Sequence, residues 1–492
     1  MRPFSKENFK FHRGNNDNPK FKTEGQFKNT LLKGNITKNI IVLAIPIITA
    51  NIIANAYYVV DMIFVGRLGP SALAAVSMGG ILMSLTWTLQ VGLTIGASSL
   101  TARFYGARDN DMVERIVINS LFLAFIIAFF LFIFGIFGTP ACLRLLGSSG
   151  EVLSLAITYT RIVFCGAGGL IFLFVINSML RGSGDVKTPM ITLGISSILN
   201  IILDPLLIFG LGPFPELGVK GAAIATVTGQ AIGALCNFII LFKGYSRIKV
   251  SSRFAAKNFS GLKHSTRALM ASVKPDLRIF KTIIKISIPG SMQNLIYSIS
   301  GLVLMRMVTI FGTPAVAAYG IGLRLDIMIM LPGWALGAAV ATILGQNLGA
   351  QQPERAEKTA WHGAGLYLGL LLILCSGLWA GAPQVISLFN NDPVVMSIGK
   401  DYIRIVSVGY LFLSFSLILN MAMNGAGYTF IPMILIAAAH LGLRIPAAFV
   451  LMKFMRMGTQ GIWVAIAGSI ILQAFLAAAW FYRGNWKRKK VA

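Results

Sequence analysis

The segment "YTRIVFCG" (residues 159–166) recurs as "YIRIVSVG" at residues 402–409. The offset is 243 residues, and a longer match keeps it: "NSMLRGSGDVKTPMI" (177–191) against "NMAMNGAGYTFIPMI" (420–434). Single residues follow a similar spacing: Pro46 with Pro289, Gly69 with Gly312, Gly106 with Gly349, and, at an offset of 240, Gly218 with Gly458. The chain is therefore predicted to consist of two copies of one structural unit.

The composition indicates that lipid surrounds most of the chain. Of its 492 residues 55% are hydrophobic and only 12% are charged, with a mean hydropathy of +0.74. About 20 apolar residues cross a bilayer as a helix. Runs of that length are 40–65, 72–102, 116–138, 152–180, 188–211, 219–242, 283–311, 315–347, 360–381, 394–421, 430–452 and 459–482. The runs are continuous rather than alternating, which excludes a β-barrel.

These observations predict an all-α polytopic membrane protein with twelve transmembrane helices in two parallel six-helix repeats. An even number of helices in each half gives both halves the same orientation. Parallel repeats of this kind are a transporter architecture, with the substrate bound between them. We therefore expect two lobes that face a shared central cavity, which opens alternately to the two sides of the membrane.

The net charge of +26 is concentrated in three segments outside the predicted helices. They are an N-terminal tail (1–38), a linker (244–281) between the lobes (39–243 and 282–482), and a C-terminal tail (483–492). Because basic loops stay in the cytoplasm, both termini are predicted to be cytoplasmic in a multi-pass protein of the inner or plasma membrane. Such segments contact anionic lipid, and no nucleic-acid partner is expected.

The two halves differ at two intramembrane acids. Asp204 aligns with Ile445 before a shared proline, and Asp61 aligns with Leu304. An ionised Asp at bilayer depth costs about 2.5–3.5 kcal/mol, so such residues normally face a cavity or a partner. The plainer interpretations are an acid near the outer surface for Asp61 and a structural, hydrogen-bonded acid for Asp204.

Polar neighbours support a functional role for both acids. Thr192, Ser196, Asn200 and Asp204 recur every fourth residue and form one stripe, and Asn51, Asn55, Tyr58 and Asp61 share one side of the first helix. Two nearby carboxyl groups in a medium of low dielectric cannot both ionise cheaply, which predicts a proton-binding site. The same oxygens would equally suit Na⁺, so the coupling ion stays open.

The second half has its own intramembrane charges. They are Arg306, Arg324, Asp326, His440 and Arg444. We expect Asp326 to pair with one of these arginines. The alternative is that they provide a counter-charge for the substrate or a second coupling site.

With these residues in view, the chain resembles the multidrug and toxic compound extrusion (MATE) family over nearly its whole length. The resemblance rests on "VVDMIFVGRLG", "MLRGSGDVKTP", "LNIILDP" and "GQNLGA". It implies a cation-coupled (H⁺ or Na⁺) antiporter that exports amphipathic, often cationic compounds. "PGSMQNLIYSIS" (289–300) and "GYLFLSFSLILN" (409–420) lack the acids that another branch has there, which favours the branch with an acidic first lobe (DinF-like).

The resemblance also implies roles for individual residues. Asp61, Asp204 and Asn200 would form the cation-coupling site, and Pro46 would be the kink of the first helix. The cavity or substrate site would include Tyr57, Asn177 and, as a weaker candidate, Thr226.

No cofactor beyond the coupling ion, no resident metal and a monomeric state are expected. The main alternative is a related flippase for a lipid or a lipid-linked saccharide, which basic cavity residues would favour. An enzyme is not expected, because the sequence has no clustered His, Cys and Glu set and no serine triad.

Overall fold

The computed structural model describes residues 30–248 and 276–489, and within them every regular element is a helix. Most of the predicted linker (244–281) and of the N-terminal tail lies outside the described residues. The first bundle contains α1 (Ile36–Gly66), α2 (Pro70–Gly106), α3 (Asn110–Phe137), α4 (Thr139–Leu145), α5 (Gly150–Cys165), α6 (Ala167–Gly182), α7 (Lys187–Ile208) and α8 (Val219–Phe242), after the short η1 (Thr30–Leu32).

The second bundle repeats this order. It contains α10 (Leu277–Val308), η2 (Thr309–Phe311), α11 (Thr313–Gly349), α12 (Pro353–Ala380), α13 (Ala382–Ser387), α14 (Pro393–Gly425), α15 (Phe430–Ala437), η3 (Ala438–Arg444), α16 (Ile445–Lys453), α17 (Gly458–Tyr482) and η4 (Asn485–Arg488). The equivalent helices α2 and α11 are both 37 residues long, as α3 and α12 are both 28 residues long. The predicted fold class is therefore confirmed.

Eleven helices in the described ranges are long and apolar enough to cross a membrane, and a bent pair makes up to twelve. That pair is α5 and α6, which meet at 44° around Gly166. A Cβ at Gly166 would collide with the side chain of Val227 on α8, so the glycine permits a close approach. The equivalent helix of the second bundle, α14, runs through Gly409 without a break.

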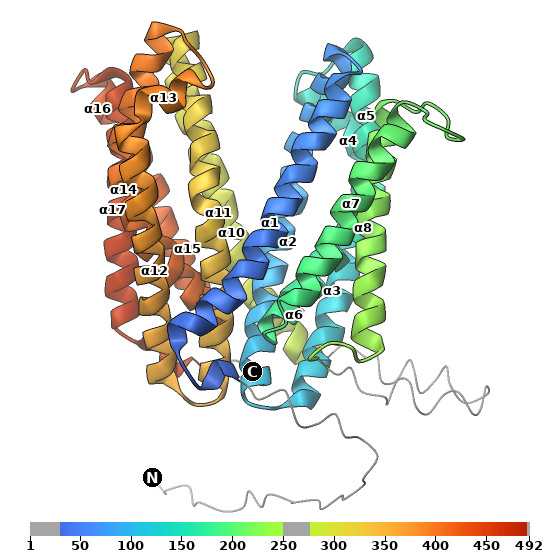
Figure 1. Cartoon of the computed structure of the whole chain (residues 1–492), viewed down its shortest axis with the longest axis vertical. Coiled ribbons are helices and arrows are strands. Elements are labelled where there is room, and N and C mark those ends of the chain that lie inside the picture. The colour runs from blue at the N-terminus through green and yellow to red at the C-terminus, as the bar shows by residue number, and fades with distance from the viewer. Residues whose placement is uncertain (1–29, 249–275, 490–492) are drawn as a thin grey trace, which may run out of the picture.

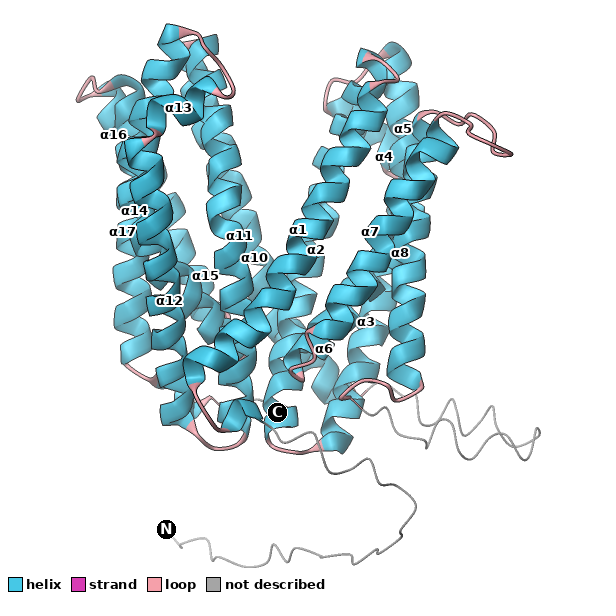
Figure 2. Ribbon diagram, in the orientation of Figure 1, coloured by secondary structure: helices cyan, strands magenta, loops and turns pink. Residues whose placement is uncertain are grey.

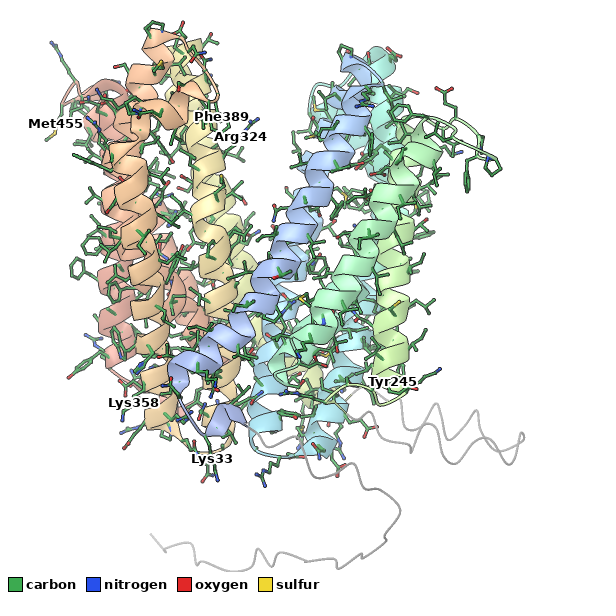
Figure 3. All side chains as sticks on the ribbon, in the orientation of Figure 1. Lys33, Tyr245, Arg324, Lys358, Phe389 and Met455 are labelled. Carbon is green, nitrogen blue, oxygen red and sulfur yellow. The ribbon has the colours of Figure 1, made fainter. Side chains whose placement is uncertain are left out.

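Figure 1 shows two bundles that meet at the end where α1 begins and diverge toward the other end. Figure 2 shows that the turns at the converging end are short. At this end Lys33 and Lys358 lie together, whereas Arg324 and Met455 lie near the diverging end (Figure 3).

The bundles are joined through a pseudo-symmetric seam between α2 and α11. Arg103 on α2 donates to the carbonyl of Ala426 at 3.4 Å, and its repeat equivalent Gln346 on α11 donates to the carbonyl of Gly182 at 2.8 Å. Gly106 and Gly349 lie at the same crossing, where a Cβ on either would collide with the backbone of the other helix. The two equivalent glycines therefore allow α2 and α11 to approach closely where the two repeats meet.

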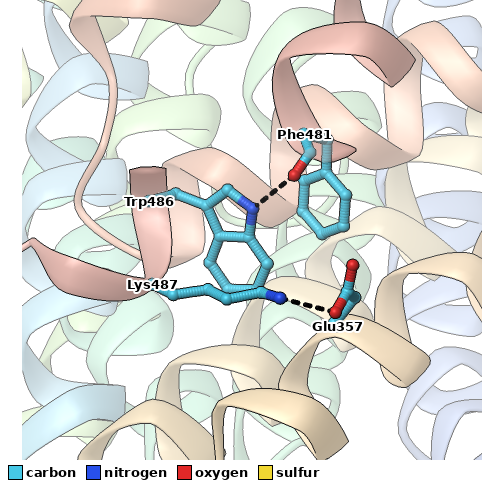
Figure 4. Close-up of polar contacts among 4 residues, drawn as sticks. All are labelled: Glu357, Phe481, Trp486 and Lys487. Atoms are coloured by element: carbon cyan, nitrogen blue, oxygen red, sulfur yellow. Dashed lines mark hydrogen bonds and ion pairs between the residues drawn. The ribbon is translucent and has the colours of Figure 1, made fainter. Parts of the chain in front are cut away.

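The chain after the last helix is fixed to the second bundle (Figure 4). Trp486 is fully buried and donates its indole N–H to the carbonyl of Phe481 at 2.9 Å. Lys487 forms an ion pair of 2.6 Å with Glu357 on α12. The end of the described chain therefore lies at the converging end of the molecule.

Candidate cation site

Helices α1 and α7 bring the two predicted acids together inside the first bundle. Asp204 is fully buried and Asp61 is 8% exposed, and the two charges are close enough to interact. In the described part of the chain, the one ion pair shorter than 4.0 Å is between Lys487 and Glu357, so neither acid has a basic partner within that distance. When both carboxyl groups are ionised they repel one another, and no positive side chain offsets that repulsion within 4.0 Å. A bound cation or proton would therefore be favourable here.

Asn200 and Thr226 complete the oxygen-rich side of the site. Asn200 is one turn before Asp204 on α7, and Thr226 lies opposite on α8. With the amide oriented to satisfy both of its atoms, its nitrogen donates to Asp204 Oδ2 at 3.2 Å and its oxygen accepts from the Thr226 hydroxyl at 3.3 Å. Three of the predicted site residues thus form one connected group.

A glycine on α8 permits this contact between helices. A Cβ at Gly229 would lie 2.7 Å from the carbonyl oxygen of Ser196 and 3.4 Å from Cβ of Asn200. Gly233, one turn later, faces Ser196 in the same manner, at 3.0 Å. Small residues four apart let helices approach closely within a membrane, so α7 and α8 can share polar side chains.

Aromatic residues line the side of Asp61. Oδ1 of Asp61 is buried without a hydrogen-bond partner in the described chain. Tyr57 is half-buried, stacks on Tyr58 at 4.2 Å between ring centroids, and contacts Gln230 on α8. Tyr159 on α5 is buried and interacts with both Asp61 and Asp204.

Sequence reasoning missed Gln230 and Tyr159. Gln230 comes one turn after Thr226, so a polar stripe on α8 was available as a signal. Tyr159 belongs to the repeated motif, so the repeat alone does not distinguish it from shared scaffold. Its equivalent, Tyr402, donates a hydrogen bond to Asp326 at 2.8 Å, whereas Tyr159 interacts with its acids only electrostatically.

Asn177 lies outside the carboxylate cluster. It is fully buried, and its Oδ1 accepts from Thr192 at 3.2 Å and from Asn237 at 3.0 Å. Thr192 is twelve residues before Asp204 on α7, which is about 18 Å along the helix. Asn177 and the acids therefore occupy the same bundle but different levels of it.

Pro46 lies in the first half of α1, which continues as a helix from Ile36 to Gly66. A proline cannot donate to the carbonyl four residues before it, which weakens the helix locally. Figure 1 shows α1 running obliquely in its lower part and more upright above. Asp61 follows Pro46 by fifteen residues on the same helix.

The expected ion pair of Asp326 in the second bundle is wrong. Asp326 on α11 accepts hydrogen bonds from the hydroxyls of Tyr402, at 2.8 Å, and Tyr410, both on α14. Arg444 instead donates through Nε to the hydroxyl of Ser469 on α17 at 2.7 Å. Arg324 is exposed and extends from α11 on the side of the first bundle (Figure 3). Asp326 and Arg444 thus interact electrostatically but form no ion pair shorter than 4.0 Å among the described residues, and each bonds to neutral hydroxyl groups.

The first-bundle site offers oxygen ligands from two carboxyl groups, one amide and one hydroxyl. One proton on a carboxyl group would remove the repulsion between the acids. A sodium ion, which prefers oxygen ligands, would do the same with its own charge. The arrangement therefore offers ligands that suit one small cation.

Comparisons with known proteins agree with this architecture. The MatE family model matches residues 46–206 and 289–450, which are equivalent parts of the two bundles. A probable multidrug resistance protein NorM of Thermotoga maritima is 28% identical over 94% of this chain and 97% of that protein. An FAD transporter of Shewanella oneidensis is 29% identical over 80% of this chain and 83% of that protein.

A solved structure of a MOP superfamily transporter from Pyrococcus furiosus superimposes with a TM-score of 0.83 and 26% identity, over 94% of this chain and 98% of that one. At this coverage the match extends over both bundles. With the family model spanning both repeats and a multi-pass helical structure in place, the chain belongs to the MatE family of multidrug and toxic compound extrusion transporters.

Proposed function

We propose that this protein is a cation-coupled antiporter that exports amphipathic, often cationic compounds from the cytoplasm. The observation that carries the proposal is the pair Asp61 and Asp204, which is buried, mutually repulsive and without a basic partner within 4.0 Å in the described chain. Relatives named as multidrug resistance proteins support export of drugs. No relative cited is a flippase, and the acidic first bundle does not favour that alternative.

Coupling follows from competition for the same negative charge. Binding of H⁺ or Na⁺ to Asp61, Asp204 and Asn200 neutralises the site, weakens the attraction for a cationic compound and favours return to the inward-open state. An ion can shift a conformational equilibrium only when it prefers one of the two states. The proline in α1 gives that helix a place to bend as the charge at Asp61 changes.

Alternating access would require the seam between α2 and α11 to open. Beside this seam the hydrogen bonds from Arg103 to Ala426 and from Gln346 to Gly182 join the two bundles, and these groups can bond to water once separated. We infer that the converging end is cytoplasmic, because Lys33 and Lys358 lie there and basic residues stay inside. We further infer that the protein acts as a monomer in the plasma membrane, within the branch coupled through an acidic first lobe.

Ethidium accumulation by inside-out membrane vesicles tests the proposal. The wild type is compared with Asp204→Asn, first with an acidic lumen and separately with a sodium-rich lumen. Accumulation driven by one gradient and abolished by the substitution would identify the ion and the site together.

Two other outcomes contradict parts of the proposal. An Asp204→Asn protein that is inserted normally and still accumulates ethidium like the wild type would make Asp204 structural. No accumulation by the wild type under either gradient would remove ethidium from the substrates and count against cation-driven export of this class.

A further inference from the structure

A groove lies between the first turn of α1 and the first half of α12. It has a volume of about 550 Å³, which is within the range of sites for small molecules. Thr37 lines it from α1, and Lys358, His362, Gly365 and Gly369 line it from α12. The four residues of α12 recur at helical spacing, so they follow one side of the helix, and all four are exposed.

The two ends of the groove differ in chemistry. Lys358 lies at the converging end of the molecule, and His362 is one turn further along α12 (Figure 3). Gly369 is eleven residues after Lys358, which is about 16 Å along the helix. Neither Gly365 nor Gly369 has an atom within 4 Å of a Cβ, so no side chain of the described chain fills that end. An ammonium group and an imidazole therefore occupy one end, and the other end is open and apolar.

The charge at the first end is not neutralised by a neighbour. No acidic residue of the described chain lines the groove. Glu354 and Glu357 precede Lys358 on α12, but Glu357 is paired with Lys487 at 2.6 Å. Lys358 forms no ion pair shorter than 4.0 Å within residues 30–248 and 276–489. Its ammonium group can therefore donate charge-assisted hydrogen bonds to an anion.

The apolar end belongs to a membrane-spanning helix. Helix α12 is long and apolar enough to cross the membrane, and Leu372 and Ile373, just beyond Gly369, are exposed. Exposed apolar side chains on such a helix face the hydrocarbon chains of lipid. Trp361 also lines the groove near its charged end, and tryptophan is enriched at the level of the lipid headgroups. The groove thus has its charges at headgroup level and its apolar part among the acyl chains.

We propose that this groove binds one anionic phospholipid from the membrane leaflet at the converging end. Lys358 and His362 hold the phosphate, the Thr37 hydroxyl provides a further donor, and an acyl chain lies over Gly365 and Gly369. Basic pockets between membrane-spanning helices bind anionic headgroups in this way. The proposal goes beyond export and requires no particular substrate or coupling ion.

A lipid in this groove would link the two bundles. Helix α1 carries Asp61 of the cation site, whereas α12 belongs to the second bundle. Arg355 on α12 already donates to the carbonyl of Gly34, just before α1, at 2.9 Å (Figure 1). The lipid would add a second connection one turn later, at Thr37. Because a ligand that binds the folded protein stabilises it, the bound lipid is expected to raise the Tm.

Native mass spectrometry of the purified, delipidated full chain measures the binding. Phosphatidylglycerol is compared with phosphatidylcholine of the same acyl chains, and the Tm of each mixture is measured in parallel. We expect phosphatidylglycerol to bind at least about tenfold tighter and to raise the Tm more, because the choline group offsets the charge of its own phosphate. No gradient and no transported compound are present, so the result does not depend on export.

Substitutions locate the binding. Lys358→Gln combined with His362→Gln is expected to reduce the preference for phosphatidylglycerol to within about threefold, because both phosphate donors are lost. Lys33→Gln is the matched control: it removes an exposed charge at the same end that does not line the groove, and it is expected to stay within about twofold of the wild type.

A second pair of variants tests the apolar end without a change of charge. Gly369→Leu fills that end and is expected to weaken phosphatidylglycerol by about tenfold, whereas Gly365→Ala adds one methyl group and is expected to have an effect within about twofold. All of the substituted residues are exposed, so folding does not depend on them.

Three results would overturn the proposal. Equal binding of the two lipids by the wild type would show that the headgroup charge is not recognised. An effect of Lys33→Gln as large as that of the paired groove substitutions would mean a general attraction to the basic surface. Glycerol 3-phosphate is added as a soluble competitor, and displacement of phosphatidylglycerol at equal concentration would identify a soluble organic phosphate, not a lipid, as the ligand.

Discussion

The two bundles share a backbone plan but differ in their electrostatics. The first holds two acids without a basic partner within 4.0 Å among the described residues, whereas in the second Asp326 accepts from two tyrosine hydroxyls and Arg444 donates to a serine hydroxyl. The difference arises on more than one helix: Asp61 on α1 and Asp204 on α7 align with Leu304 and Ile445, and Arg444 lies two residues before Pro446, the equivalent of Pro205. The repeated scaffold thus carries different polar side chains at equivalent levels of the two bundles.

The neighbouring helix changed in parallel. Gly229 on α8 allows close contact with Asn200, whereas its equivalent at an offset of 240 residues is Ser469, which binds Arg444. In the first bundle the glycine lets α7 and α8 approach closely enough for their polar side chains to bond. In the second bundle the serine hydroxyl accepts a hydrogen bond from the arginine. If the two bundles have different roles in transport, substitutions at equivalent positions of the two repeats will change transport differently.

The largest expected difference concerns the acids themselves. Asp204→Asn or Asp61→Asn is expected to lower gradient-driven ethidium accumulation by about 100-fold, or ~2.7 kcal/mol, because the cation site loses its charge. Asp326→Asn is expected to raise the ethidium concentration that gives the half-maximal initial rate, while the rate still responds to the ion gradient. Initial rates across a range of ethidium concentrations and gradients separate the two effects. Equal loss of the ion response in both bundles would contradict the division of roles.

A second prediction tests whether the two bundles contribute equally to stability at the seam between α2 and α11. Gly106→Ala and Gly349→Ala each place a methyl group against the backbone of the other helix, and overpacking of this kind costs about 1–3 kcal/mol. We expect both to lower the Tm in nanodiscs by similar amounts. Gly365→Ala is the control, because no atom lies within 4 Å of a Cβ there. A Tm change confined to one of the two seam variants would show that the seam is not symmetric.

How far the sequence predicts this molecule depends on the property in question. The repeat placed α2 and α11 at 72–102 and 315–347, against the observed Pro70–Gly106 and Thr313–Gly349, because hydropathy and a fixed offset both follow the chain. Asn200 and Asp204 could be predicted as neighbours, since one helical turn separates them. Their contact with Thr226 needed the family resemblance.

The partners of Asp326 could not be predicted, because they depend on how neighbouring helices are rotated about their axes. Tyr402 and Tyr410 are 76 and 84 residues away in the chain, on a helix whose apolar pattern does not reveal which side faces α11. Arginine was the expected partner on charge alone. The phenolic groups prevail because two of them, two turns apart on α14, converge on the same oxygen atom.

A third prediction concerns the contact between α7 and α8. Gly229→Ala would push the backbone of Ser196 and the side chain of Asn200 away, so we expect about a tenfold weaker apparent affinity for the coupling ion. Gly194→Ala on α7 is the matched control, because that glycine is buried but has no atom within 4 Å of a Cβ. The affinity is measured as the lumenal ion concentration that gives half-maximal ethidium accumulation. An equal effect from Gly194→Ala would mean that helix flexibility, not helix contact, sets the affinity.

The smallest expected effect tests where the cation site ends. Thr226→Val removes one hydroxyl with little change of volume, and loss of its hydrogen bond with Asn200 is expected to weaken the apparent ion affinity by about threefold. Thr192→Val makes the same change on the same polar stripe of α7, next to Asn177, and is expected to leave ion affinity unchanged. If Thr192→Val has the larger effect, the stripe acts as one continuous pathway and the ion site extends to Asn177. If only Thr226→Val has an effect, the cation is held at the level of Asp204, and the lower polar cluster serves to pack α6 against α7 and α8.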